Sequence, residues 1–288
     1  MRVWLLGKSR PRRFDIPLRM RSLISPFVPL IIAALCCACS SRYDVYLLIG
    51  QSNMAGRGIL EAADTLQAAE GVFLLDGQGT AVPARNPLNR YSTIRKVITM
   101  QGMGPGWSFG QAVHARTGRP VLLVVNARGG STLQMWLPDA PAEYYGRGDE
   151  DPENIGQRMP SLYDEAIRRT RQALRYGKLK GILWHQGESG VDADNVGDYL
   201  PVLARFVAAL RSDLGVDERV PFLAGEILPE YEPSAFINPM LQQIGDYIPN
   251  ARCVSAAGLQ GNPDRLHFSR ESQLEFGRRY AAALEGKD

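Results

Sequence analysis

Short aliphatic runs alternate with amphipathic stretches along most of this chain, and this alternation restricts the folds open to it. We expect strands at 43–49, 120–126, 180–185, 220–227 and 251–256, with a weaker run at 72–76. Apolar residues at helical spacing predict helices at about 106–117, 160–177, 195–214, 234–247 and 269–285. Strands separated by helices need crossover connections, so the expected fold is α/β, a mainly parallel five-stranded sheet covered on both faces.

The first 38 residues have the layout of a secretory leader and are not expected to join this fold. A basic start at 20–22 precedes an apolar stretch that ends in small residues before Cys39. The stretch is too short, and too closely followed by polar sequence, for a membrane span. Met20 is a candidate start, and cleavage before Cys39 would leave a lipid-attached N-terminal cysteine or a plainly secreted protein. The expected mature protein is one exported domain, 39–288, at the periplasm, the outer surface or outside the cell.

Loss of this leader changes the charge of the chain. The whole sequence has 33 Lys and Arg against 30 Asp and Glu, a net charge of +3. The leader holds seven of the basic residues and one acidic residue, so 26 basic and 29 acidic residues remain, a net charge of −3. The basic balance therefore gives no reason to expect nucleic acid as a partner. Beyond Cys39 the sequence has only Cys253, which excludes a disulfide framework and a zinc-like cysteine spacing.

Polar residues follow three of the expected strands, at the end where ligands gather in open α/β sheets. The first strand ends in Gly-Gln-Ser-Asn, which puts the Ser52 hydroxyl at its carboxyl end. After the strand at 180–185, the Gln186 amide is able to donate to a developing oxyanion. After the strand at 120–126, the paired glycines Gly129 and Gly130 let backbone N–H groups approach a ligand. Ordinary turn chemistry is the alternative interpretation of all three segments.

The chain has three histidines, which shortens the search for a general base. His114 lies within a helical pattern and His185 ends a strand, whereas His267 follows Asp264 by three residues. An aspartate at that spacing can reach the histidine Nδ1, fix the tautomer and stabilise the imidazolium that forms when the ring takes a serine proton. A loop ion pair or a helix cap is the alternative for this pair taken alone.

Taken together and in chain order, these segments resemble the motifs of the sialate O-acetylesterase and acetylxylan esterase group, a branch of the SGNH (GDSL-like) hydrolases. The resemblance covers about 44–285, and it rests on the segments 50–54, 104–109, 128–131, 184–189 and 264–267. It implies a flavodoxin-like, three-layer α/β/α fold. It also implies hydrolysis of O-acetyl esters on carbohydrates without a metal or an organic cofactor.

The same resemblance implies a role for each motif residue. Ser52 is the expected nucleophile, His267 the general base and Asp264 its orienting partner. The oxyanion donors would be the backbone N–H groups of Ser52 and Gly130 and the side chain of Gln186, which stands where general SGNH hydrolases carry asparagine. Four further side chains are expected to touch sugar hydroxyls or to support the loops: Gln51, Asn53, Arg128 and Glu188. The sequence departs from the familiar motif at Arg265, which replaces a small residue beside the Asp–His pair.

The resulting hypothesis is a serine hydrolase that deacetylates sialic acid or polysaccharide through an acetyl-serine intermediate. One alternative is a lipase-like or thioesterase-like SGNH hydrolase of short acyl esters. Another is a surface lipoprotein that binds carbohydrate without catalysis. The loops at 57–70, 77–103 and 133–160 are expected to select the sugar, and the sequence does not identify it.

Overall fold

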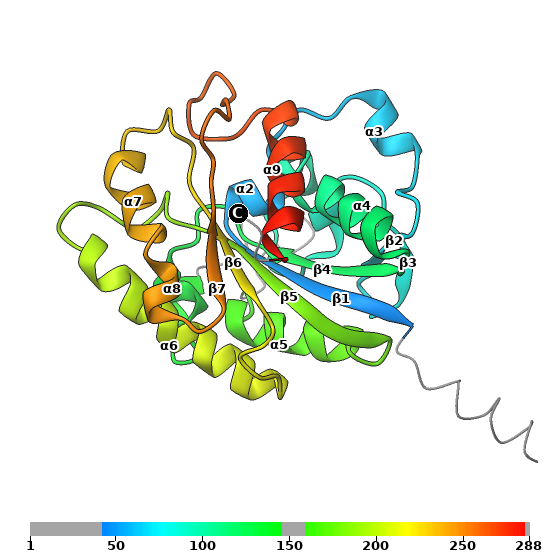
Figure 1. Cartoon of the computed structure of the whole chain (residues 1–288), viewed down its shortest axis with the longest axis horizontal. Coiled ribbons are helices and arrows are strands. Elements are labelled where there is room, and N and C mark those ends of the chain that lie inside the picture. Colours follow the sequence, from blue (N-terminus) through cyan, green and yellow to red (C-terminus); the bar gives the residue numbers. More distant parts are fainter. Residues whose placement is uncertain (1–41, 146–158, 286–288) are drawn as a thin grey trace, which may run out of the picture. The chain divides into compact units, whose positions relative to one another are not determined.

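The structure, a computed structural model, describes residues 42–145 and 159–285, which form a seven-stranded sheet between two layers of helices (Figure 1). The strand order is β3-β2-β4-β1-β5-β6-β7. Neighbouring strands pair in parallel, except for the antiparallel pair β2–β3. The strands are β1 (Tyr43–Gly50), β2 (Val72–Leu75), β3 (Ala81–Pro83), β4 (Val121–Ala127), β5 (Gly177–His185), β6 (Phe222–Gly225) and β7 (Ala251–Val254).

The expected α/β fold with a mainly parallel sheet is confirmed, whereas the expected number of strands was too low. The five strong runs form β4, β1, β5, β6 and β7, which are adjacent in that order. Numbered along the chain, this is the order 2-1-3-4-5 of flavodoxin-like sheets. The weak run at 72–76 becomes β2, and β3 pairs with it at the sheet edge. β3 was missed because its three residues are too few to show an alternating pattern.

Residues of β1 alternate between two hydrophobic cores, one on each face of the sheet. Val45, Leu47 and Ile49 belong to the core that includes residues of α5 and α6, and Tyr46 and Leu48 belong to the core that includes residues of α4 and α9. Figure 1 shows these helix pairs on opposite faces. All of β1 is buried, as expected for a parallel strand covered on both faces.

The helices agree closely with the expected ranges, with one interruption. The range 234–247 forms two helices rather than one, α7 and α8. The apolar stripe of α6 is buried, including Tyr199, Leu203 and Phe206. The α-helices are α2 (Ser52–Ala55), α3 (Ala62–Leu66), α4 (Gly106–Thr117), α5 (Leu162–Ala173), α6 (Val196–Leu214), α7 (Ser234–Leu241), α8 (Ile244–Tyr247) and α9 (Arg270–Ala283). Short 3₁₀ turns lie at Leu88–Tyr91, Ile98–Met100, Leu133–Trp136 and Ala142–Tyr145.

Two expectations concern parts of the chain outside the described residues. The leader at 1–38 and the following Cys39 lie there, as does the segment 146–158 of the long loop expected at 133–160. Within 42–145 and 159–285, no helix is both long enough and apolar enough to cross a membrane.

Candidate active site

The nucleophile candidate lies where β1, the middle strand of the sheet, turns into α2. Gly50 makes this turn with a φ of 131°, and a Cβ atom at Gly50 would lie 2.1 Å from the carbonyl oxygen of His185. Only glycine fits there, because any side chain would collide with the backbone of β5. The N–H of Gln51 donates to the same carbonyl oxygen at 2.8 Å. These contacts place Ser52, the first residue of α2, at the carboxyl end of β1.

Three residues predicted from the motifs come together at this point. His267 Nε2 lies 2.9 Å from Ser52 Oγ, and His267 Nδ1 lies 2.7 Å from Asp264 Oδ2. The other carboxylate oxygen, Asp264 Oδ1, accepts the backbone N–H groups of Leu266 at 3.0 Å and His267 at 2.9 Å. This arrangement can draw the proton from a serine hydroxyl while a fixed carboxylate orients the imidazole.

The Asp264 carboxylate is held in its charged form. Burial acts to raise its pKa, but the backbone N–H of His267, the His267 ring and the N–H of Leu266 together bring that pKa below its ordinary value. The carboxylate is therefore ionised at neutral pH, where it favours a proton on His267 Nδ1. Its side chain is 49% exposed, so water reaches the outer side of the pair.

Two residues that follow strand ends, Ser52 after β1 and Gly130 after β4, line the same pocket and carry backbone N–H groups. Gly130 follows β4 and has a φ of 74°, a conformation that suits glycine. The hydrogen bonds made within the described chain use neither the N–H of Ser52 nor that of Gly130. Both residues line a pocket of about 220 Å³ together with Gln51 and His267. Two free N–H groups beside a serine can stabilise the oxyanion of an acyl-transfer intermediate.

The side-chain amide expected to join these donors is not free in this structure. Gln186 is fully buried, and its Nε2 lies 2.7 Å from the carbonyl oxygen of Ser189, 3.3 Å from that of Ser131 and 3.1 Å from Gln51 Oε1. Tyr199 donates its hydroxyl to Gln186 Oε1 at 2.8 Å. The two N–H groups of the Gln186 amide are thus committed inside the protein.

A second glutamine, Gln51, lies beside Ser52 and contacts Gln186. Its side chain lines the pocket beside Ser52, and Gln186 holds its Oε1. The Nε2 of Gln51 makes no hydrogen bond to any described residue. Because Gln186 fixes the oxygen of this amide, the nitrogen is the end left for a ligand. In this structure the amide nitrogen without a partner beside Ser52 is therefore that of Gln51, and the oxyanion role expected for Gln186 stays a prediction.

Of the remaining predicted side chains, Glu188 belongs to a residue that lines the pocket, whereas Arg128 and Asn53 lie outside its lining. Arg128 donates to the carbonyl oxygens of Ile94 and Arg95, each at 3.3 Å, and so supports that loop. Asn53 is buried behind Ser52 and is not a lining residue. Glu188 lines the pocket, and Asn53 donates to its carboxylate at 2.6 Å.

Sequence reasoning missed a cation beside the nucleophile. Arg57 lines the pocket and donates to the carbonyl oxygen of Gly56 at 2.8 Å. Its guanidinium packs against Gly129, where a Cβ atom would lie 2.6 Å from Arg57 Nη2 and 3.6 Å from the Cβ of Ser52. Burial lowers the pKa of Arg57 to about 10, so the group stays protonated at neutral pH. In the described residues no carboxylate pairs with it.

Three other lining residues were also missed: Lys96, Met100 and Tyr231. They come from loops whose conformation has no signal in residue spacing. Arg57 could have been suspected, because it follows Ser52 by five residues in the same segment.

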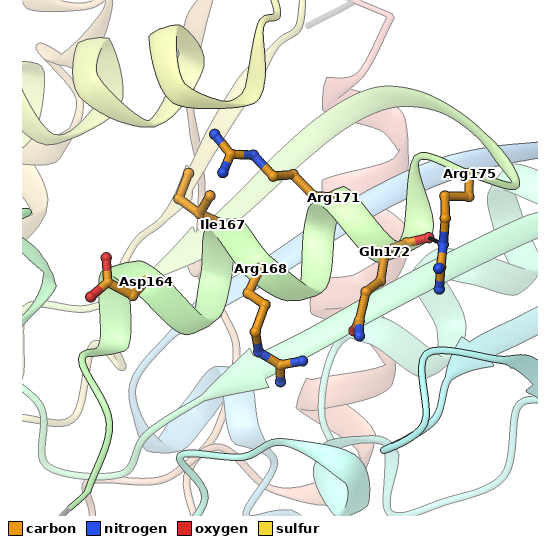
Figure 2. Close-up of a pocket in the computed structure, with 6 residues that line it drawn as sticks. All are labelled: Asp164, Ile167, Arg168, Arg171, Gln172 and Arg175. Atoms are coloured by element: carbon orange, nitrogen blue, oxygen red, sulfur yellow. Dashed lines mark hydrogen bonds between the residues drawn. The ribbon is translucent and has the colours of Figure 1, made fainter.

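A second hollow lies over α5, away from these residues (Figure 2). It is lined by Asp164, Ile167, Arg168, Arg171, Gln172 and Arg175. Arg168 forms an ion pair with Glu165 at 2.8 Å, and Arg171 donates to the carbonyl oxygen of Asp213 at 2.6 Å. The lining includes neither a nucleophile nor a histidine, so we assign the chemistry to the pocket at Ser52.

Comparison with known proteins agrees with this geometry. Residues 42–285 match the carbohydrate esterase family described as sialic acid-specific acetylesterase. The chain belongs to this family. A probable carbohydrate esterase of Arabidopsis thaliana is 29% identical over 262 residues, which cover 83% of this chain and 89% of the relative. The expected family and the expected class, carboxylic ester hydrolases, are thereby confirmed.

Solved structures share the fold. An Arabidopsis thaliana protein superposes with a TM-score of 0.70 at 24% identity, over 85% of this chain and 99% of the other. NanS superposes with a TM-score of 0.60 at 16% identity, over 86% and 98%. A carbohydrate acetylesterase from Xanthomonas citri gives a TM-score of 0.56 at 19% identity, over 85% and 57%. These likenesses confirm the layered α/β architecture.

Proposed function

We propose that this protein is a serine esterase that removes O-acetyl groups from carbohydrates through an acetyl-Ser52 intermediate. The observation that carries the proposal is the continuous contact from Ser52 Oγ through His267 to Asp264, at 2.9 and 2.7 Å. It faces a pocket whose backbone N–H donors are unused within the described chain, and the chain belongs to a family of carbohydrate esterases.

In the first step, Ser52 Oγ attacks the acetyl carbonyl carbon while His267 Nε2 takes the hydroxyl proton. The Asp264 carboxylate stabilises the imidazolium that forms. The oxyanion accepts hydrogen bonds from the N–H groups of Ser52 and Gly130 and from Gln51 Nε2. As the intermediate collapses, the bond from carbonyl carbon to sugar oxygen breaks, and His267 returns its proton to that oxygen.

In the second step, water replaces the sugar. His267 removes a proton from the water as its oxygen attacks the acetyl-Ser52 carbonyl carbon. Collapse of the second intermediate breaks the ester bond to Ser52 Oγ, which regains its proton from His267. The products are acetate, the free sugar hydroxyl and regenerated enzyme.

The nucleophile is tested with Ser52→Ala. We expect this variant to keep its circular dichroism spectrum and thermal midpoint while losing the release of 4-nitrophenol from 4-nitrophenyl acetate. Full activity in Ser52→Ala would refute the proposal. A preference of the wild type for long acyl chains would favour a lipase-like or thioesterase-like hydrolase. Sugar binding without acetate release would favour a carbohydrate-binding protein.

The oxyanion amide is tested by comparing two glutamines. Gln51→Met removes the donor in the pocket, and loss of one such donor lowers kcat by about 10²–10³-fold. Gln186→Met removes the partner of the Gln51 oxygen and the buried contacts to Ser131, Ser189 and Tyr199, but it leaves the Gln51 donor in place, so its kcat should fall less. If Gln186→Met falls further than Gln51→Met, the donor role returns to Gln186.

Among the candidate substrates, the cation beside Ser52 favours an acidic sugar such as sialic acid over neutral xylan. A half-buried guanidinium without a carboxylate partner among the described residues can bind the carboxylate of the substrate. We expect acetate release from O-acetylated sialic acid to exceed release from acetylated xylan. Arg57→Gln should reduce this ratio, whereas the exposed control Arg219→Gln should leave it unchanged. Equal wild-type rates on the two sugars would contradict this preference.

We also propose that the leader is cleaved before Cys39 and that Cys39 then carries lipid. In a bacterial host, radiolabelled palmitate should be incorporated into the wild type and not into Cys39→Ser. Absence of label from both, with cleaved protein in the medium, would favour plain secretion.

A further inference from the structure

The side chain of Asn53 connects the nucleophile to the backbone on both sides of the catalytic base. Asn53 follows Ser52 in α2 and is 1% exposed. Its Nδ2 donates to the carbonyl oxygen of Leu266 at 3.2 Å, and its Oδ1 accepts the N–H of Phe268 at 3.1 Å. These are the residues immediately before and after His267. One amide therefore binds both peptide groups that flank the base.

The Asn53 amide is itself held from behind by a buried acid. Its second N–H donates to Glu188 Oε1 at 2.6 Å, a short bond of the charge-assisted kind. The same oxygen lies 3.1 Å from His185 Nε2, and both of these side chains are only 1% exposed. Burial acts to raise the pKa of Glu188, but the His185 ring and the donated hydrogen bonds bring it below its ordinary value. Glu188 is thus a charged anchor whose position the core determines.

A further contact completes the hydrogen bonding of Asn53. Gln273, in α9, donates its Nε2 to the backbone oxygen of Asn53 at 3.1 Å and to its Oδ1 at 3.4 Å. Both N–H groups and both acceptor positions of the Asn53 side chain are then in use. A fully satisfied buried amide has one favourable orientation, because any rotation leaves buried polar groups unpaired.

The other hydrogen bonds on the two peptide groups of His267 stay within its own segment: the N–H of His267 donates to Asp264 Oδ1 at 2.9 Å, and its carbonyl oxygen accepts the N–H of Asn262 at 2.7 Å. Residues 255–269 connect β7 to α9 without regular helix or strand, and Arg265 has a left-handed φ of 55°. The Asp264 side chain is 49% exposed, so packing does not fix it. The buried Phe268 ring packs against Phe276 with the ring centroids 5.0 Å apart, and Asn262 Nδ2 donates to the carbonyl oxygen of Arg57 at 3.1 Å. Among the described residues, Asn53 is the one that hydrogen-bonds the two peptide groups of His267 to α2.

We infer that Asn53 is a positioning residue: by binding the peptide groups before and after His267, it keeps the imidazole at hydrogen-bond distance from Ser52, with Glu188 as its anchor. The inference rests on the proposed Ser52–His267 chemistry. Asn53 does not touch the reacting atoms, so its loss lowers kcat and leaves KM nearly unchanged. A displacement of about 1 Å between reacting groups lowers rates by about 10²-fold.

The test combines Asn53→Ala with His267→Ala. We expect Asn53→Ala to lower kcat for 4-nitrophenyl acetate about 100-fold, with KM within about threefold of the wild type. In the Asn53→Ala background, His267→Ala should cause a much smaller further loss than in the wild type, because the base is already misplaced. Glu188→Gln should lower kcat in part and add nothing to Asn53→Ala.

Asn238, a half-buried residue of α7, provides a control for the structural effect of losing an amide that binds backbone. It binds the backbone of Ile227 in the same way, donating to the carbonyl oxygen at 3.0 Å and accepting the N–H at 2.9 Å. Asn238→Ala should lower the thermal midpoint as Asn53→Ala does. Its effect on kcat should be independent of His267→Ala, so that the two fold-losses multiply in the double variant.

A measurement without turnover separates this inference from the proposed function. Crystal structures of the wild type and Asn53→Ala should show the Ser52 Oγ to His267 Nε2 distance lengthening beyond hydrogen-bond range in the variant. An unchanged distance, or a kcat within threefold of the wild type, would overturn the positioning role. If Ser52→Ala and the wild type have equal activity, the proposed function fails, and the crystallographic distance still decides the role of Asn53.

Discussion

Replacement of Asp264 by asparagine tests how the carboxylate controls the proton on His267. In the wild type, one carboxylate oxygen accepts two backbone N–H groups, from Leu266 and His267, and the other faces His267 Nδ1. The amide oxygen of the introduced asparagine must take the first position, since an NH₂ group there would face two donors. The NH₂ group then faces Nδ1. The ring proton moves to Nε2, where it points at Ser52 and blocks removal of the hydroxyl proton.

The size of the effect follows from two contributions. Forcing the proton back to Nδ1 leaves two donors facing each other, which costs about 1–3 kcal/mol. Loss of the negative charge beside the imidazolium, about 4 Å away, costs between about 1 kcal/mol in water and about 4 kcal/mol near a protein surface. Because Asp264 is 49% exposed, we take about 2 kcal/mol for this contribution. The barrier rises by about 3–5 kcal/mol, so kcat falls roughly 150- to 5,000-fold.

The assay is steady-state hydrolysis of 4-nitrophenyl acetate between pH 7 and 9, and Asp264→Ala supplies the decisive comparison. In Asp264→Ala, water can accept the Nδ1 proton at this exposed position, so the productive tautomer survives. We therefore expect the alanine variant to be more active than the asparagine variant. Asp217→Asn, which alters an exposed pair with Arg219, is the control with unchanged activity. An asparagine variant more active than the alanine variant, or within tenfold of the wild type, would refute the tautomer explanation.

Two further predictions concern stability. Gly50→Ala forces a Cβ atom into the carbonyl oxygen of His185 at a left-handed φ. We expect the free energy of unfolding to fall by about 3 kcal/mol and the thermal midpoint in calorimetry to fall by about 6–12 °C. A shift of the midpoint under about 2 °C would contradict this. Asp64 has a lowered pKa in the folded protein, chiefly because Arg270 donates to its carboxylate. Its contribution to stability is therefore complete above the ordinary aspartate pKa, and it is lost as the pH falls through the lowered pKa of the folded state. Asp64→Asn should therefore lower the free energy of unfolding in urea by about 1–3 kcal/mol at pH 7 and by less at pH 3, whereas an equal loss at both values would count against the ion pair.

Short-range patterns in the sequence were enough to predict much of the fold and the pairing of Asp264 with His267. The central strands are long aliphatic runs, so periodicity found them, whereas β3 is too short to show a period. Asp264 and His267 could be paired from spacing because they share one turn, which closes through hydrogen bonds to backbone N–H groups two and three residues on from the aspartate.

The hydrogen bonds of the two glutamine amides could not be predicted in this way. β1 and β5 are neighbours whose ends are in register at Gly50 and His185, so Gln51 and Gln186 leave the sheet side by side. Tyr199 distinguishes them, because its hydroxyl donates to Gln186 Oε1 and turns that amide inward. Such a contact comes from the packing of α6, which no local pattern encodes. Arg57 escaped notice for a similar reason, since only the folded path of the loop places it over Gly129.

The distance along the chain between Ser52 and His267 has a consequence for the newly made protein. The two residues are 215 positions apart, and the base lies between the last strand and the last helix. During synthesis, the serine leaves the ribosome long before the histidine does. A chain interrupted before His267 carries Ser52 and the backbone N–H groups of the pocket without the imidazole. Under the proposed mechanism, hydrolysis therefore requires almost the whole chain, and the enzyme can become active only after the segment before α9 has been made and folded against α2.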